Sequence, residues 1–334
     1  MIDGKPAWEG KRKGHLFIRV PVAEVLGGTL TLPLHAFLGS HDGPTLGITT
    51  TVHGDETLPA MIVRRLLREI DPAELSGRVC AITVCNPLAM SIFGRQTPEQ
   101  HGRTDLHEIF PGSAGGNLTQ QMAHTIASNL LDHVDAHVDY HCGGSGGRLQ
   151  ERVDFDRDAP EGVKAESLKL ARCFGTMMVH ENNLAGSAVR YVNDRGRPAF
   201  DAETGGIYLG PEVTDYYVQA AVESLCNVMK AMKMLPGEPV APPRQACFAS
   251  SHRVEVNPTH GGFLESFFQD SGQLGQRVDK GTELGQVIDM YSLEVVERLV
   301  APVDGYLFFS RYSGVVDAGT KGFALADKAG IEWL

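Results

Sequence analysis

The sequence predicts an α/β protein with a mixed, largely parallel central sheet flanked by helices, followed by a small all-β domain. Three observations predict this. Short apolar runs alternate with helix-periodic segments as far as residue 235, which is typical of α/β domains. A proline-rich stretch, PGEPVAPPRQ, follows at 236–245 and has the composition of a linker. Helical periodicity is absent beyond it, so we expect a first domain over 1–240 and a β-rich domain over 248–334.

The first elements are strands. Residues 15–22 (HLFIRVPV) and 29–40 (TLTLPLHAFLGS) alternate in polarity and end in turn residues, which indicates two antiparallel strands. TLGITTTV at 45–52 is β-branched and uncharged, as a buried central strand requires. The apolar spacing of 57–70 predicts an amphipathic helix. RVCAITVCNP at 78–87 is a second buried strand that ends at its Asn-Pro pair.

The middle of the chain begins with a long polar loop. Residues 88–116 are rich in glycine, proline and polar side chains, and a loop of that length inside a compact domain is usually functional or disordered. The elements expected after it are a helix at 117–134, a strand at 136–141, a helix at 163–178, a short strand at TMMVHE, a strand at 197–206 and a helix at 213–235.

The C-terminal segment contains only short strands broken by glycine and aspartate. They are expected at GGFLESFF, GTELGQVIDM, VERLVAPVDGYLFFSRYS and KGFALAD. No helix-periodic segment lies between them, which favours a small all-β domain.

Composition excludes several classes of function. The formal charge of −11, from 30 basic and 41 acidic residues, argues against a nucleic-acid partner. The six cysteines form no C-x-x-C pair, which disfavours a zinc knuckle and suits reduced thiols in the cytoplasm. No apolar run approaches the ~18 residues of a membrane span, and no apolar segment follows the basic N-terminus. We therefore expect a cytoplasmic protein with a small-molecule substrate, and homo-oligomerisation stays open.

Three residues form a candidate metal site. His53 follows a buried strand, Glu56 stands at the start of the next helix, and His141 ends another buried strand before a run of glycines. Catalytic zinc typically takes three nitrogen or oxygen ligands and leaves a fourth position for water. The alternative is that His53 caps the helix and that Glu56 is a first-turn carboxylate favoured by the helix dipole.

A rival set consists of His133, His137 and His141, spaced as three ligands on one helix face. We reject it because VDYHCGG has the pattern of a strand, so these side chains do not share a helix. Asp139 lies two residues before His141 and therefore on the same strand face, where it can hydrogen-bond a ligand imidazole.

Three motifs together resemble a known family. His53-Gly54-Asp55-Glu56, the strand end Asp139-Tyr140-His141 and PAFDAETGG at 198–206 are similar to the aspartoacylase / succinylglutamate desuccinylase family, a branch of the zinc carboxypeptidase-like hydrolases. The resemblance extends over nearly the whole chain. It implies the zinc carboxypeptidase-like fold, one Zn²⁺ per chain, a water nucleophile and a glutamate general base, with the C-terminal domain covering the active-site mouth.

By position, Glu203 matches the family's catalytic glutamate. Glu212 competes for that role, but it follows Gly210-Pro211 and has the position of a helix-start residue. The resemblance implies a zinc-dependent amidohydrolase that cleaves the amide bond of a small N-acyl amino acid or related compound. The alternatives are a carboxypeptidase-type peptide hydrolase and a non-catalytic zinc-dependent binding protein. Cobalt or manganese would also fit the ligand set.

The chain departs from the family where substrate is bound. The family has an arginine and then a D-L-N-R-x-F-P-G-like segment, whose Asn-Arg pair holds a substrate carboxylate. Here Arg95 is followed by DLHEIFPG at 105–112, so His107 and Glu108 replace that pair and reverse a charge. Either the substrate lacks that carboxylate or another arginine holds it. The candidates are Arg95, Arg103 and Arg190, while Glu108 is placed to meet a cationic amine.

Overall fold

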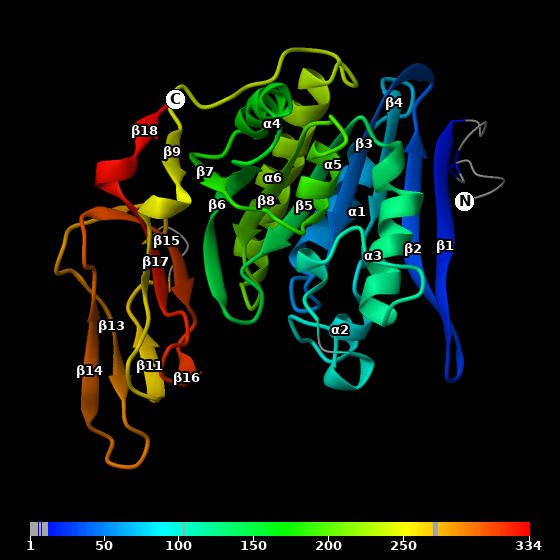
Figure 1. Ribbon diagram of the computed structural model, residues 1–334. Helices are drawn as coiled ribbons and strands as arrows, with labels where there is room; N and C mark the ends of the chain where they lie inside the picture. The colour runs from blue at the N-terminus through cyan, green and yellow to red at the C-terminus, as the bar shows by residue number, and fades with distance from the viewer. Residues whose placement is uncertain (1–5, 7, 9–12, 103, 270–272) are drawn as a thin grey trace.

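The computed structural model describes residues 6, 8, 13–102, 104–269 and 273–334 (Figure 1). It confirms the predicted fold class: helices flank a large mixed sheet, and a small antiparallel sheet stands apart. The helices are α1 (Leu58–Glu69), α2 (Pro87–Ser91), α3 (Leu118–Asn129), α4 (Glu161–Phe174), α5 (Ala188–Asn193) and α6 (Pro211–Ala231). Among the described residues, no helix has both the length and the apolar character needed to cross a membrane.

The large sheet joins strands from both ends of the chain. Its strands are β1 (Gly14–Val25), β2 (Gly28–Leu38), β3 (His41–Thr50), β4 (Ser76–Ile82), β5 (Ala136–Cys142), β6 (Gly147–Asp156), β7 (Met178–Asn182), β8 (Ala199–Gly205), β9 (Ala246–Ala249), β10 (Arg253–Val256), β12 (Arg277–Val278), β15 (Gly305–Arg311), β17 (Phe323–Asp327) and β18 (Glu332–Trp333). The small sheet holds β11 (Gly262–Ser266), β13 (Glu283–Ile288), β14 (Val295–Val300) and β16 (Gly314–Val316).

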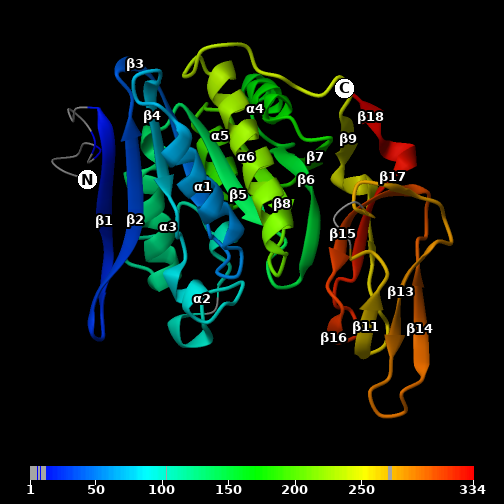
Figure 2. The same ribbon diagram turned by 180° about the vertical axis from the view of Figure 1, so that it is seen from behind.

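The centre of the large sheet is parallel. β4, β3, β5 and β8 run side by side in parallel, while β1 and β2 extend one edge in antiparallel fashion. Helices α1, α4 and α6 cover one face, and α3 and α5 cover the other (Figures 1 and 2). The carboxyl ends of β3, β5 and β8 therefore meet at one edge of the parallel region, where ligands bind in open α/β sheets.

Several elements differ from those that the sequence predicts. The unpredicted ones include strand β6, the short helices α2 and α5, and the short strands β9, β10, β12 and β18. Strand β15 pairs with β6, so several C-terminal strands continue the large sheet instead of forming a wholly separate layer. Only β11, β13, β14 and β16 form a sheet of their own, at the end of the molecule opposite β1 (Figure 1). This pairing brings residues from the end of the chain beside the centre of the sheet.

Helix α1 shows how the local sequence builds the core. Its buried residues Leu58, Ile62, Val63 and Leu66 recur at helical spacing and pack against the sheet. We expect Ile62→Ala to lower the free energy of unfolding by about 2–5 kcal/mol, because the buried side chain leaves a cavity. Urea denaturation measures the change. The adjacent Met61 is 50% exposed, so Met61→Ala should change stability by less than about 0.5 kcal/mol. Equal losses in the two variants would contradict this packing.

Candidate active site

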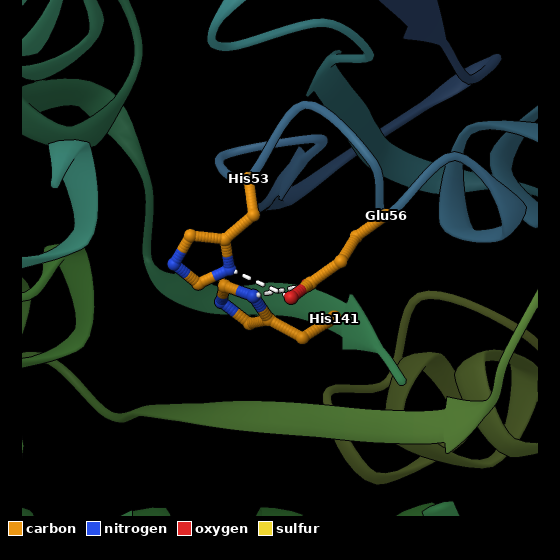
Figure 3. Close-up of side chains that lie close together, drawn as sticks. All are labelled: His53, Glu56 and His141. Carbon is orange, nitrogen blue, oxygen red and sulfur yellow. Dashed lines mark hydrogen bonds and ion pairs between the residues drawn. The ribbon is translucent and has the colours of Figure 1, made fainter. Parts of the chain in front are cut away.

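His53, Glu56 and His141 converge at the carboxyl ends of the central strands (Figure 3). His53 and Glu56 lie in the connection from β3 to α1, and His141 lies in β5. His53 Nδ1 is 2.8 Å from Glu56 Oε1, and His141 Nδ1 is 2.9 Å from Glu56 Oε2. One ligand atom from each residue lies within 4.8 Å of the other two, and all three residues are buried. These three side chains are a candidate metal group.

The donor set fits a divalent ion such as zinc. Two imidazole nitrogens and a carboxylate form a typical catalytic zinc triad with room for a further ligand. Burial by itself would raise the pKa of Glu56, but His53 and His141 hold that pKa well below its usual range. These neighbours therefore favour the ionised form of the Glu56 carboxylate, which is the form that binds a cation. Metal binding requires this form, with the imidazoles neutral.

A carboxylate supports the outer nitrogen of each histidine. His53 Nε2 is 3.2 Å from Asp105 Oδ1, and His141 Nε2 is 3.3 Å from Asp139 Oδ2. Asp139 is itself held by a hydrogen bond that Thr49 Oγ1 donates to its Oδ1, at 2.6 Å. Such carboxylates fix the tautomer and the orientation of a ligand imidazole. His107, Asp139 and His141 form a second candidate group, which overlaps the first through His141. We favour the first, because all three of its residues are buried, whereas His107 in the second is only partly buried.

We expect Asp139→Asn to weaken zinc binding by about 10–100-fold. The asparagine side chain can still accept the hydrogen bond from Thr49, but it offers no negative charge to His141. Chelator competition measures the affinity, and Asp317→Asn, at an exposed aspartate, is the matched control. Unchanged zinc affinity in Asp139→Asn would mean that Asp139 does not support the site.

Two rows of polar side chains cross the same face of the sheet. Residues paired across neighbouring strands share a face, and so do residues two apart on one strand. The register pairs the residues of β5, β8 and β6 in two adjacent rows, Asp139–Asp201–Asp154 and His141–Glu203–Arg152. The register thus brings Glu203 next to the candidate metal group. It adds three charged residues for which the sequence predicted no role: Asp201, Asp154 and Arg152.

Glu203 has the surroundings of an activated carboxylate. Burial raises its pKa above the usual range, and Arg152 opposes that rise. Arg152 Nη2 donates to Glu203 Oε1 at 3.1 Å, while Glu203 Oε2 has no hydrogen-bond partner among the described residues. Glu203 therefore has one oxygen held in place and one oxygen free. A raised pKa brings a carboxylate closer to the range of an efficient general base at neutral pH.

The acids beside Glu203 differ in the direction in which their pKa values are shifted. Burial raises the pKa of Asp201 well above its usual range, helped by Asp139 and Asp154. Burial would also raise the pKa of Asp154, but Arg152 and His180 hold it below the usual range. Asp201 is therefore the member of its row that holds a proton most readily. The negative charge of Asp154 is balanced by Arg152, whose Nε donates to Asp154 Oδ1 at 2.7 Å.

A cavity of about 230 Å³ lies over these side chains. It is lined by the candidate metal group together with Glu203, Arg95 and His107. Arg95 Nη1 is 3.4 Å from Glu56 Oε1, and the ring of His107 stands 5.0 Å from that of His141. Burial lowers the pKa of His107, which favours a neutral ring. The two residues come from the 88–116 segment, so that segment does reach the cavity.

Two residues expected to bind substrate, Glu108 and Arg190, are not among the described side chains that line the cavity. Glu108 is exposed. Arg190 makes ion pairs with Asp156 and Asp158, which occupy its guanidinium. Arg103 lies outside the described residues. Instead, the C-terminal strands and their loops supply Arg253, Phe308, Phe309 and Lys321 to the cavity wall.

These additional cavity residues could not be predicted from local sequence, because the pairing of distant strands places them. Segment 147–156 (GRLQERVDFD) is largely buried although six of its ten residues are charged or amide-bearing. Two of these, Arg152 and Asp154, line the cavity. In this segment, the alternation of Leu149, Val153 and Phe155 with polar residues was the available signal for a strand. Arg253 and Lys321 carry no motif, and only the pairing of the C-terminal strands places them.

Comparison with known proteins agrees with this geometry. Residues 42–226 match the model of the succinylglutamate desuccinylase/aspartoacylase catalytic domain. A curated relative, N-alpha-acetyl-L-2,4-diaminobutyric acid deacetylase of Halomonas elongata, is 24% identical over 323 residues, which cover 91% of this chain and 89% of the relative.

Solved structures share the fold over almost the full length. A succinylglutamate desuccinylase from Silicibacter sp. TM1040 has a TM-score of 0.83 at 20% identity and covers 98% of both chains. The product-bound ectoine utilization protein EutE (DoeB) of Ruegeria pomeroyi has a TM-score of 0.82 at 21% identity, over 97% of this chain and 98% of that one. The family match includes the candidate metal group and Glu203. The chain belongs to the succinylglutamate desuccinylase/aspartoacylase family of amide-hydrolysing deacylases.

Proposed function

We propose that the protein is a zinc-dependent amidohydrolase that removes the acyl group from a small N-acyl amino acid. The observation that carries the proposal is the convergence of the candidate metal group and Glu203 on one buried cavity. With a volume of about 230 Å³, this cavity suits a small molecule better than a peptide chain.

His53, Glu56 and His141 would hold the ion. When bound, zinc supplies a lowered pKa for water and polarisation of the scissile carbonyl. Asp105 and Asp139 keep the two imidazoles in the orientation that binding needs. Arg95 lies beside Glu56 and offers a positive charge to the oxygen of the substrate carbonyl as negative charge develops there.

Glu203 is the proposed general base. Its free Oε2 accepts the proton of the attacking water and then transfers it to the leaving nitrogen, while Arg152 holds Oε1 in place. Arg152 thereby acts as a positioning residue. General acid–base catalysis of this kind contributes about 10²–10⁴-fold to the rate.

The name of one relative supports the choice of substrates to test. The Halomonas elongata relative is named for removing an acetyl group from an amino acid, so N-acetyl amino acids are the first compounds to test. The zinc-loaded protein should hydrolyse at least one member of a panel of N-acetyl- and N-succinyl-L-amino acids, and chelation should abolish the release of free amine. A wild-type protein loaded with zinc that releases no amine from any member would contradict the proposal.

A further inference from the structure

We propose that a cation cluster formed by Arg152, Arg253 and Lys321 binds the carboxylate on the amine half of the substrate. This inference rests on the proposed function and names the substrate class more closely. The amino-acid product must carry a free carboxylate. In the family, the Asn-Arg pair binds a substrate carboxylate. In this chain, residues of β6 and of the C-terminal strands and loops would bind it instead.

The three cations lie close to the aromatic rings of Phe308 and Phe309, two consecutive residues of β15. The Cζ atoms of Arg152 and Arg253 lie 5.1 and 5.7 Å from the centroid of Phe308. Lys321 Nζ lies 4.3 Å from the centroid of Phe309. All five side chains line the cavity that holds the candidate metal group. The cluster therefore stands in the wall of the proposed active site and not on an unrelated surface.

Of the three cations, Lys321 is the one whose charge is least neutralised by carboxylates. Among the described residues it makes no ion pair within 4.0 Å, whereas Arg253 pairs with Glu255 and Arg152 pairs with Asp154 and Glu203. Burial, together with Arg253, lowers the pKa of Lys321 to about 8. An ammonium group in this setting gains free energy when an anion enters. The carboxylates nearby are Glu203 and Glu255, and Arg152 and Arg253 already pair with them.

The position of Glu203 determines which half of the substrate the cation cluster contacts. Glu203 returns its proton to the leaving nitrogen, so the amine half lies on the Glu203 side of the metal group. Arg152 contacts Glu203 directly, at 3.1 Å, and the other two cations stand next to Arg152. A carboxylate that reaches the cluster is therefore attached to the amine half. The acidic His107–Glu108 segment no longer carries the family's arginine, so the chain needs another source of positive charge.

The test compares an N-acetyl-L-amino acid that the wild type hydrolyses with its carboxamide analogue, which has the same shape and no charge. We expect the wild type to prefer the acid in kcat/KM by about 10–100-fold, as the loss of a charged hydrogen bond predicts. Lys321→Met should raise KM for the acid by about tenfold or more and leave kcat/KM for the carboxamide unchanged. Arg253→Gln should likewise lower the ratio of kcat/KM for the acid to kcat/KM for the carboxamide. Lys280→Met, at an exposed lysine, should leave kcat/KM for both substrates unchanged.

The outcomes separate the two proposals. A wild type that hydrolyses acid and carboxamide equally well, or a Lys321→Met variant that loses both in proportion, would overturn the carboxylate site and leave the amidohydrolase intact. A wild type without any hydrolysis would instead contradict the proposed function. In that case calorimetric titration of the zinc-loaded protein with the same two compounds still decides the carboxylate site: tighter binding of the acid, lost in Lys321→Met, supports it, and equal binding overturns it.

Discussion

Glu203→Gln should lower kcat by about 10²–10⁴-fold and leave one zinc ion per chain. Glutamine keeps the size of the side chain and can still accept the bond from Arg152 to Oε1. Glutamine cannot take a proton from water, so only the rate of the chemical step should fall. Because Glu203 is not a member of the candidate metal group, metal content should stay at the wild-type level. Steady-state kinetics and atomic absorption on the same preparation give both quantities.

Glu212→Gln is the matched control. Glu212 was the competing glutamate in the sequence, and it lies exposed in the first turn of α6. Its replacement should leave kcat within about twofold, because a surface substitution away from the cavity has little effect. Near-wild-type turnover in Glu203→Gln would refute the assignment of the base. A loss confined to Glu212→Gln would transfer the role to that residue.

His53→Ala should remove the metal itself. The variant retains two of three ligands, and its zinc content after dialysis should fall from about one ion per chain to near zero, since catalytic sites rely on three protein ligands. Hydrolysis should disappear with the metal. Elemental analysis checks the first expectation, and circular dichroism checks that the fold survives. This contrasts with Glu203→Gln, where activity is lost and the metal stays.

His133→Ala tests the rival histidine set. His133 lies in a short turn after α3, its Nε2 contacts the carbonyl oxygen of Ser128, and it does not line the cavity. This variant should keep zinc and activity. Loss of zinc in His133→Ala, or full zinc content in His53→Ala, would contradict the assignment of the metal site.

The sequence by itself determined the elements that depend on local pattern. The apolar spacing of α1 and the β-branched run of β3 can be read within a dozen residues, because burial of one face imposes a period on the chain. His53, Glu56 and His141 could be grouped for the same reason. Each stands where such a pattern ends, and strand ends meet at one edge of a parallel sheet.

The tertiary structure alone decided which charges surround that group. Arg152 faces Glu203 because β6 pairs with β8, and β6 escaped prediction since its polar side chains are buried against the cavity. Arg190 looked like a substrate arginine from its place before Glu203, but its partners Asp156 and Asp158 come from the end of β6 and the turn after it. Lys321 and Arg253 reach the cavity only because β15 continues the large sheet beyond β6. These are pairings between distant segments, and their free energy comes from contacts that no local window of sequence contains.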